Sequence, residues 1–336
     1  MQHVLERIEE QLRAGLISRR KFVALSAMAT AQAAMPAFAQ GTSMPFPVIT
    51  LNHVSIPVAN PPKTLEFYQK IFDFSIFTSQ SNGKVPAMTI SGGPQSVMLA
   101  DSNIYPRERL KHHSCLGMRN FDPNVVVKTL NANGIEASAR PRPAAASVPP
   151  GTIDTPELGF RDPDGLALQI QAADYCGGTG FLGNECKFDP AKRTKSLLVV
   201  RTLNSVQHYV SNVDRSLAFY LKVFDVKVRT RQAKGAVPIL TIGDGPHFIS
   251  LHEGDSIGHH FTLGIENFDA QQALKVLKSQ GVAAELRMRP AAEQRPIVEG
   301  AKDTPEIKFL DPDGIGVTLV DWRNAGGVGP IGSIVA

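Results

Sequence analysis

The chain has 336 residues, of which 43% are hydrophobic, 20% charged and 7% aromatic. This composition is typical of a globular protein and excludes a disordered chain or a fibre, and the length predicts two domains. The formal net charge is +4 without a concentrated basic stripe, and no run of about 18 apolar residues occurs, so we expect neither a nucleic-acid partner nor a membrane span.

Residues 1–39 have the features of a secretory signal peptide. Arg19 and Arg20 precede a weakly apolar stretch, which ends in the small residues of Ala37-Phe38-Ala39. A basic region, a short apolar region and small residues at a cleavage point are typical of such signals. The paired arginines followed by Lys21 and Phe22 resemble the twin-arginine export signal. That resemblance implies a periplasmic protein exported by the twin-arginine machinery; an amphipathic N-terminal helix is the alternative.

The cysteines fit an exported protein. Cys176 and Cys186 flank a glycine-rich turn within residues 176–198, which we interpret as a linker. In an oxidising compartment this pair is expected to form a disulfide, the alternative being two unpaired thiols. Cys115 lies apart from them in an apolar strand.

The rest of the chain is a duplication. Leu51-Asn52-His53-Val54 recurs as Leu203-Asn204-Ser205-Val206, and Asp162-Pro163-Asp164-Gly165 recurs from Asp311. A repeat of about 150 residues indicates duplicated domains, because solenoid repeats are far shorter. We therefore predict a first domain over residues 49–175, a second over 199–323 and a tail over 324–336.

Each domain reads as strand, helix and several strands, twice in succession. The expected helices begin at Pro61-Pro62, Asp122, Asn212 and Asp269, and the second helix of each domain ends before Gly134 or Gly281. Short apolar runs such as Ser96–Leu99 fit strands, and the two Asp-Pro-Asp-Gly segments fit turns. Tyr68 and Tyr220, among apolar helix residues, are expected in the core.

This order of motifs resembles the vicinal oxygen chelate superfamily, which holds glyoxalase I, bleomycin-resistance proteins and type I extradiol dioxygenases. The resemblance covers residues 49–322 and rests on the strand at Leu51–Val58, the helix with Phe67-Tyr68, the segment His113–Met118 and the ending Asp162–Gln169. It implies an α+β fold of two tandem domains, each with two βαβββ modules that curl a sheet into a cup with helices outside. It also implies metal ligands on the first, fourth, fifth and eighth strands of a cup.

Strand alternation independently selects which side chains face the first cup. Residues one apart on a strand point to opposite faces. The apolar face of each strand should pack on the helices: Val54, Ile56 and Val58; Ser114, Leu116 and Met118; Leu166, Leu168 and Ile170. The opposite face then carries His53 and Ser55, His113 and Cys115, and Gln169 and Gln171.

His53, His113 and Gln169 are therefore the candidate metal ligands. Two imidazoles and one further donor form a minimal site for a catalytic divalent ion such as Fe(II), Mn, Ni or Zn. The family's dioxygenases place a glutamate where this chain has Gln169, so the neutral amide predicts weaker metal binding. The alternative is that the three side chains form a hydrogen-bonded set without metal.

The second domain is predicted to be structural or to form a metal-free binding cup. Its equivalent positions hold Ser205, His260 and Thr318, with Gln207 beside them, and one imidazole does not make an ordinary metal site. Arg140 and Arg142 recur as Arg287 and Arg289. Each pair either lines a cup rim for an anionic substrate or forms ion pairs with the acidic residues of the repeated loop, Asp154 and Glu157 or Asp303 and Glu306.

Two classes of function follow. The first is an exported metalloenzyme that acts on a small oxygenated substrate. The leading hypothesis within this class is ring-cleaving dioxygenase chemistry on a catecholic or phenolic compound. The alternative is lyase or isomerase chemistry of the glyoxalase type. In that class Ser55, Cys115, Gln171, Arg140 and Arg142 are candidate substrate contacts. The second class is a metal-free protein that sequesters a small molecule, as bleomycin-resistance proteins do.

Overall fold

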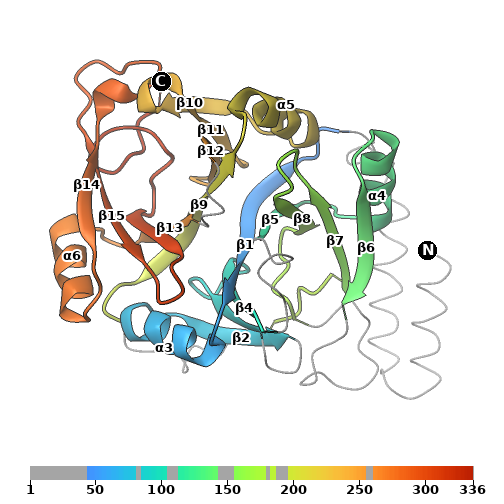
Figure 1. The fold of residues 1–336 in the computed structure, drawn as a ribbon, viewed down its shortest axis with the longest axis horizontal. Coiled ribbons are helices and arrows are strands. Elements are labelled where there is room, and N and C mark those ends of the chain that lie inside the picture. Colours follow the sequence, from blue (N-terminus) through green and yellow to red (C-terminus); the bar gives the residue numbers. More distant parts are fainter. Residues whose placement is uncertain are drawn as a thin grey trace.

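The computed structural model describes residues 44–80, 85–103, 113–142, 155–178, 182–186, 196–254 and 260–335. The predicted signal peptide, residues 1–39, lies outside these ranges. Within them, no helix is long and apolar enough to cross a membrane. The two repeats fold as two α+β domains, each built on one eight-stranded sheet (Figure 1).

The first domain contains two βαβββ modules. The first module comprises β1 (Val48–Val58), α3 (Pro61–Ile71), β2 (Ser75–Gln80), β3 (Val85–Thr89) and β4 (Ser96–Asp101). The second comprises β5 (His113–Met118), α4 (Pro123–Ala132), β6 (Ala137–Arg142), β7 (Thr155–Arg161) and β8 (Ala167–Ala172). The strand order is β2-β3-β4-β1-β5-β8-β7-β6, so the modules join where β1 pairs antiparallel with β5.

The second domain repeats this layout. Its first module comprises β9 (Val200–Val210), α5 (Val213–Val223), β10 (Val228–Gln232), the short helix η2 (Ala233–Gly235), β11 (Val237–Thr241) and β12 (Phe248–Glu253). Its second comprises β13 (His260–Ile265), α6 (Ala270–Ser279), β14 (Glu285–Arg289), η3 (Ala291–Glu293), β15 (Thr304–Leu310) and β16 (Gly316–Asp321). The order β10-β11-β12-β9-β13-β16-β15-β14 matches the first sheet strand for strand, which confirms the predicted fold class.

The helix boundaries follow the predicted capping residues. Asn60 accepts a hydrogen bond from the Lys63 backbone before α3, and Asp122, Asn212 and Asp269 cap α4, α5 and α6 in the same way. These caps satisfy amide groups that the first helical turn leaves without an intrahelical partner. Gly134 and Gly281 follow α4 and α6 with φ of +76° and +78°, a left-handed conformation that favours glycine.

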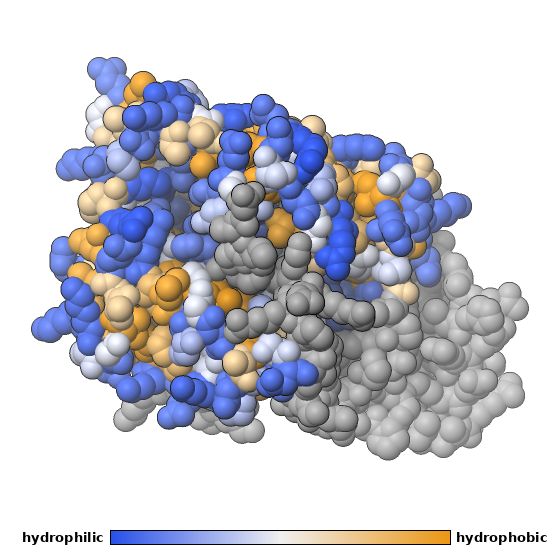
Figure 2. Space-filling model, in the orientation of Figure 1, coloured by the Kyte–Doolittle hydropathy of each residue, from blue (hydrophilic) through white to orange (hydrophobic). Residues whose placement is uncertain are grey.

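The core lies between each sheet and its helices. The side chains predicted to pack outward from the cup, including Val54, Ile56, Leu116 and Ile170, are fully buried. Tyr68 and Tyr220 are buried as predicted, among Phe72, Phe74 and Phe224. The molecular face in Figure 2 is accordingly mainly hydrophilic, with apolar residues in small separate groups.

Each Asp-Pro-Asp-Gly turn contacts the first helix of the other domain. Asp313 accepts hydrogen bonds from the Ala59 amide at 2.7 Å and the Thr64 hydroxyl at 2.6 Å, at the start of α3. Asp164 contacts the start of α5 in the same manner, accepting from Ser211, Arg215 and Ser216. In Figure 1, α3 and α5 accordingly lie at the junction of the domains, and α4 and α6 lie at the outer sides. The sequence predicts these turns but not that they hold the two domains together.

We expect Asp164→Asn to lower the free energy of unfolding by about 1–2 kcal/mol at pH 7. Burial raises the pKa of the Asp164 carboxyl, but hydrogen bonds from Ser211, Arg215 and Ser216 outweigh it and lower the pKa to about 2. The folded state therefore favours the carboxylate, and its stabilisation is present above the unfolded pKa near 4 and is lost as the pH falls toward 2.

Urea unfolding of wild type and Asp164→Asn between pH 7 and pH 3 measures this contribution. The difference between the two proteins should shrink as the pH falls below about 4. Asp225→Asn removes an exposed carboxylate and serves as the control, with an expected change within about 0.5 kcal/mol. A difference that stays constant down to pH 3 would contradict the assigned role of Asp164.

The cysteine pair of the linker forms the expected disulfide. Cys176 and Cys186 are bonded across ten residues, and the backbone between them turns back on itself where Cys176 and Gly178 both donate to the Gly183 carbonyl. Cys115 is a buried thiol. The predicted tail is packed rather than loose, because Thr304 donates to the Gly329 carbonyl at 2.9 Å and Arg289 donates to the Gly326 and Gly327 carbonyls.

Candidate functional site

The three predicted ligands lie on neighbouring strands at the centre of the first sheet. His53 on β1 pairs with Cys115 on β5, and Cys115 pairs with Gln169 on β8. His113 lies one step along β5 on the same face, since it is two residues from Cys115, and pairs with Ser55. A register shift between Leu51 and His53 sets this alignment. The cup-facing row predicted from alternation is therefore present.

The two imidazoles meet directly. His53 Nε2 and His113 Nε2 are 3.2 Å apart, with the rings edge to face. Two nitrogen ligands bound at about 2.0–2.1 Å to one tetrahedral or octahedral ion lie about 2.9–3.4 Å apart. The observed separation is that of a ligand pair; without an ion, the same distance is a hydrogen bond between the rings.

Asn52 fixes the protonation of His53. The Asn52 amide nitrogen donates to the Ala173 and Tyr175 carbonyls at 3.3 and 2.8 Å, so its oxygen faces His53 Nδ1 at 2.9 Å. An amide oxygen can only accept, so Nδ1 carries the proton and the Nε2 lone pair faces His113. Metal-binding histidines are commonly oriented by such a partner on the second ring nitrogen.

Gln169 lies on the same row as His53, two strands away. At the usual strand spacing, the Cα atoms of the two residues are roughly 10 Å apart. Its side chain is buried, as a cup position requires. In the described part of the chain, no three His, Cys, Asp or Glu side chains are grouped so as to hold a metal. The two imidazoles are spaced as a pair of metal ligands, and Gln169, the third predicted ligand, is a neutral amide on the same row.

Cys115 lies on the row of His53 and Gln169, and Gln171 lies two residues further along β8. Burial raises the pKa of the Cys115 thiol well above its usual value, and the nearby Glu157 carboxylate adds to the shift. Gln171 donates to the Pro156 carbonyl at 3.2 Å, whereas its buried Oε1 accepts no hydrogen bond from the described residues. A buried acceptor without a donor indicates space for a water or a ligand hydroxyl.

Three residues near the site have no predicted role in it: Asn52, Tyr175 and Ser96. The Tyr175 ring lies 5.6 Å from that of His53. Ser96 on β4 pairs with His53 on β1, and its buried hydroxyl has no hydrogen-bond partner among the described residues. Asn52 stands in the repeated Leu-Asn motif, which is the one signal that could have drawn attention to it. Arg140 pairs with Glu157 and Arg142 with Thr155 through the backbone; their side chains lie outside what the structure describes.

The second cup encloses a cavity of about 200 Å³, lined by Ser205, Gln207 and Thr318 among others. Its histidine turns away from the position that His113 takes: His260 Nε2 lies 2.7 Å from Thr318 Oγ1. The ring sits over Gly316, where a Cβ would lie only 2.7 Å from His260 Nδ1. The first domain has Ala167 at this point, in register with His113, so that space is filled there.

The second arginine pair, Arg287 and Arg289, forms ion pairs and also lines a cavity, so both alternatives stated from the sequence apply to it. Arg289 forms an ion pair with Glu306 at 2.7 Å, and Arg287 pairs with Glu285 at 2.5 Å rather than with the repeated loop. Asp303 instead accepts from the Ala291 amide. Both arginines nevertheless line the cavity of the second cup.

Solved structures with this fold include dioxygenases and a glyoxalase. The 2,3-dioxygenase LapB from Pseudomonas sp. KL28 is 14% identical, with a TM-score of 0.56 over 81% of this chain and 91% of that chain. The Mn(II)-bound glyoxalase from Novosphingobium aromaticivorans is 15% identical, with a TM-score of 0.58 over 82% and 84%. Homoprotocatechuate 2,3-dioxygenase from Arthrobacter globiformis is 15% identical, with a TM-score of 0.54 over 84% and 83%. At this identity the similarity establishes the fold alone.

Sequence comparison gives the family of the first domain. No curated protein matches the chain. Residues 50–170 match the sequence profile of the Glyoxalase/Bleomycin resistance protein/Dioxygenase superfamily, a range that spans the strands carrying His53, His113 and Gln169. The family match therefore covers the first domain, and the second domain repeats the strand order of the first.

Proposed function

We propose that the chain is a metal-dependent enzyme whose first cup binds a small oxygenated substrate, with ring-cleaving dioxygenase-like chemistry on a catecholic or phenolic compound. The observation that carries this proposal is the pair of imidazole nitrogens 3.2 Å apart, of which one is held in the ligating tautomer by Asn52. The similarity of the whole fold to dioxygenases supports the choice of reaction.

A divalent ion held by His53, His113 and Gln169 would supply Lewis-acid attraction for two adjacent substrate oxygens. Because all three donors are neutral, the protein leaves the ion's charge uncompensated, which favours a substrate that binds through anionic oxygens. Asn52 keeps the His53 Nε2 lone pair directed into the cup. The Gln171 Oε1 acceptor and the Ser96 hydroxyl are placed to orient substrate hydroxyl groups.

A glyoxalase-type lyase or isomerase is the second candidate. The similarity to an Mn(II)-bound glyoxalase favours it, as does Gln169, since an amide ligand suits a reaction in which the metal only polarises substrate oxygens. A metal-free sequestering protein is the third, and the same imidazole pair would then be a hydrogen bond at the floor of a binding cup.

Metal analysis and oxygen uptake distinguish these functions. The full chain, purified without chelators, should contain one Fe, Mn, Ni or Zn ion per molecule. Oxygen consumption with a panel of catechols, accompanied by ring-opened products, supports the dioxygenase. Bound metal without oxygen consumption supports the lyase, and absence of metal after reconstitution with each ion supports sequestration and contradicts the proposed enzyme.

Export through the twin-arginine pathway to the periplasm is part of the proposal. It rests on the sequence of residues 1–39, and the Cys176–Cys186 disulfide fits an oxidising compartment. Replacing Arg19 and Arg20 with lysine should retain the protein in the cytoplasm of a bacterial host, as measured by fractionation. Unchanged periplasmic yield would contradict this route.

A further inference from the structure

The second cup has a charged residue, Lys308, at a position where the first cup has a glycine. Along the central row, the first cup has Cys115, Gln169 and Gly159, and the second has Thr262, Thr318 and Lys308. Where the first domain has a glycine on its β7 strand, the second thus has a lysine in register with Thr318, and both line the cavity. Ser205 adds a third hydroxyl, in register with Thr262, where the first domain has His53.

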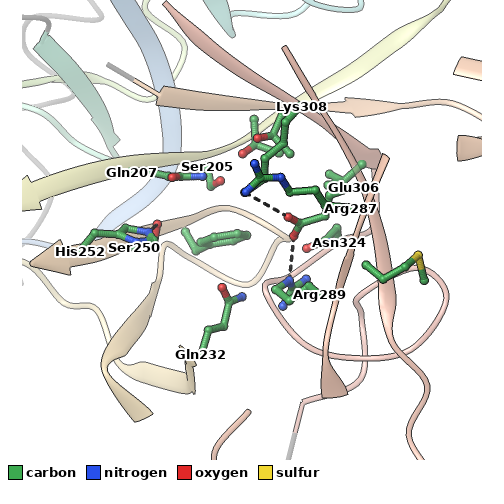
Figure 3. A pocket seen from close by; sticks show the side chains of 15 residues that line it. Ser205, Gln207, Gln232, Ser250, His252, Arg287, Arg289, Glu306, Lys308 and Asn324 are labelled. Atoms are coloured by element: carbon green, nitrogen blue, oxygen red, sulfur yellow. Dashed lines mark hydrogen bonds and ion pairs between the residues drawn. The ribbon is translucent and has the colours of Figure 1, made fainter. Parts of the chain in front are cut away.

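Three cations, Arg287, Arg289 and Lys308, and one carboxylate, Glu306, line this cavity. Arg287 is paired with Glu285 outside the lining, so the remaining excess is about one positive charge. Glu306 is held by Arg289 at 2.7 Å and by Lys308 at 3.6 Å, so its charge is already matched within the wall. Figure 3 shows these four side chains on β14 and β15, opposite Ser205, Gln207, Ser250 and His252 from β9 and β12.

His252, which lines this cavity, and His260, which contacts the lining residue Thr318, add no charge. Burial and the nearby Lys308 ammonium lower the pKa values of His252 and His260 to about 4, although Glu306 acts in the opposite direction. Both rings are therefore neutral at pH 7 and serve as hydrogen-bonding groups. His252 Nε2 is 3.0 Å from the Ser250 hydroxyl, and His260 Nε2 is 2.7 Å from that of Thr318.

Asn324 also lines this cavity. Its side-chain oxygen accepts from the Gly326 amide at 2.9 Å, and its amide nitrogen packs against Gly332, without an acceptor among the described residues.

We propose that the second cup is a metal-independent binding site for a small aromatic carboxylate, with Lys308 providing the cationic contact that a metal would provide elsewhere in the fold. The hydroxyls of Ser205, Thr262 and Thr318 supply further hydrogen bonds. Phe248, Met288 and Val320 form the apolar part of the lining. A volume of about 200 Å³ is below the range of drug-sized pockets and suits a ligand of one ring.

Calorimetric titration of the metal-free full chain with benzoate tests this proposal. Benzoate should bind with one-to-one stoichiometry, and benzamide, a neutral molecule of nearly the same shape, should bind at least about tenfold more weakly. Lys308→Met should weaken benzoate binding by about 10- to 100-fold, whereas Lys308→Arg, which keeps the charge, should retain it.

The His53→Ala/His113→Ala variant separates this site from the proposed metal centre, because it should bind benzoate as the wild type does. Circular dichroism and thermal unfolding verify that the Lys308 variants are folded. Absence of saturable benzoate binding, equal binding of benzamide, or unchanged affinity in Lys308→Met would overturn the proposal. Loss of benzoate binding in the double histidine variant would overturn the proposal as well, because it would show that benzoate binds in the first cup.

Discussion

Replacing His53 with alanine should lower the affinity of the chain for Fe(II) or Mn(II) by more than about 100-fold, because removal of a ligand exceeds the 10- to 100-fold effect of changing a residue that only orients one. The variant removes the imidazole whose Nε2 lies 3.2 Å from that of His113. His113→Ala should have a similar effect. Competition with a chromophoric chelator measures both affinities.

His260→Ala is the matched control. It removes the equivalent imidazole from the second domain, which bonds to Thr318 rather than to another histidine. Its metal affinity should equal that of the wild type. Equal losses in His53→Ala and His260→Ala, or no loss in either, would show that the imidazole pair does not hold the ion.

Gln169→Glu should strengthen metal binding by about 10- to 100-fold. A carboxylate brings a negative charge to the ion, and interactions with charged groups contribute about 1.5–3 kcal/mol, roughly twice as much as neutral ones. It also restores the two-histidine, one-carboxylate set that the family's dioxygenases use. If the neutral amide limits oxygen chemistry, oxygen uptake with catechols should rise together with the affinity.

Thr318→Glu tests whether the carboxylate alone is enough. Thr318 occupies the position of Gln169 in the second domain, but Ser205 stands where a second imidazole would be needed. This variant should acquire no second metal equivalent. If Thr318→Glu increased metal affinity as much as Gln169→Glu does, the increase would reflect a general electrostatic effect rather than the geometry of the first cup.

The fold could be predicted from the sequence because its signals are local and repeated. Capping residues such as Asp122 and Asp269 mark the same helix twice, and alternation on β1, β5 and β8 separates core from cup positions without knowledge of the fold. The meeting of His53 and His113 follows from that alternation once the two strands are neighbours.

The remaining features depend on contacts between distant segments. Asp164 and Asp313 look like turn residues in the sequence, but their carboxylates bind the opposite domain. Asn52 is repeated as Asn204, which forms the same contacts to the turn after the last strand, so repetition alone could not reveal its bond to His53. The role of Lys308 can be recognised only from the structure, which aligns Lys308 on β15 with Thr318 on β16 and shows that the first domain has Gly159 at the same position.

A crystal of the chain purified without chelators, measured at the absorption edge of its bound metal, tests the central claim most directly. We expect one anomalous peak per molecule in the first domain, about 2.0–2.2 Å from Nε2 of both His53 and His113. A structure in which those nitrogens remain in direct hydrogen-bonding contact, with no peak between them after metal reconstitution, would contradict the account.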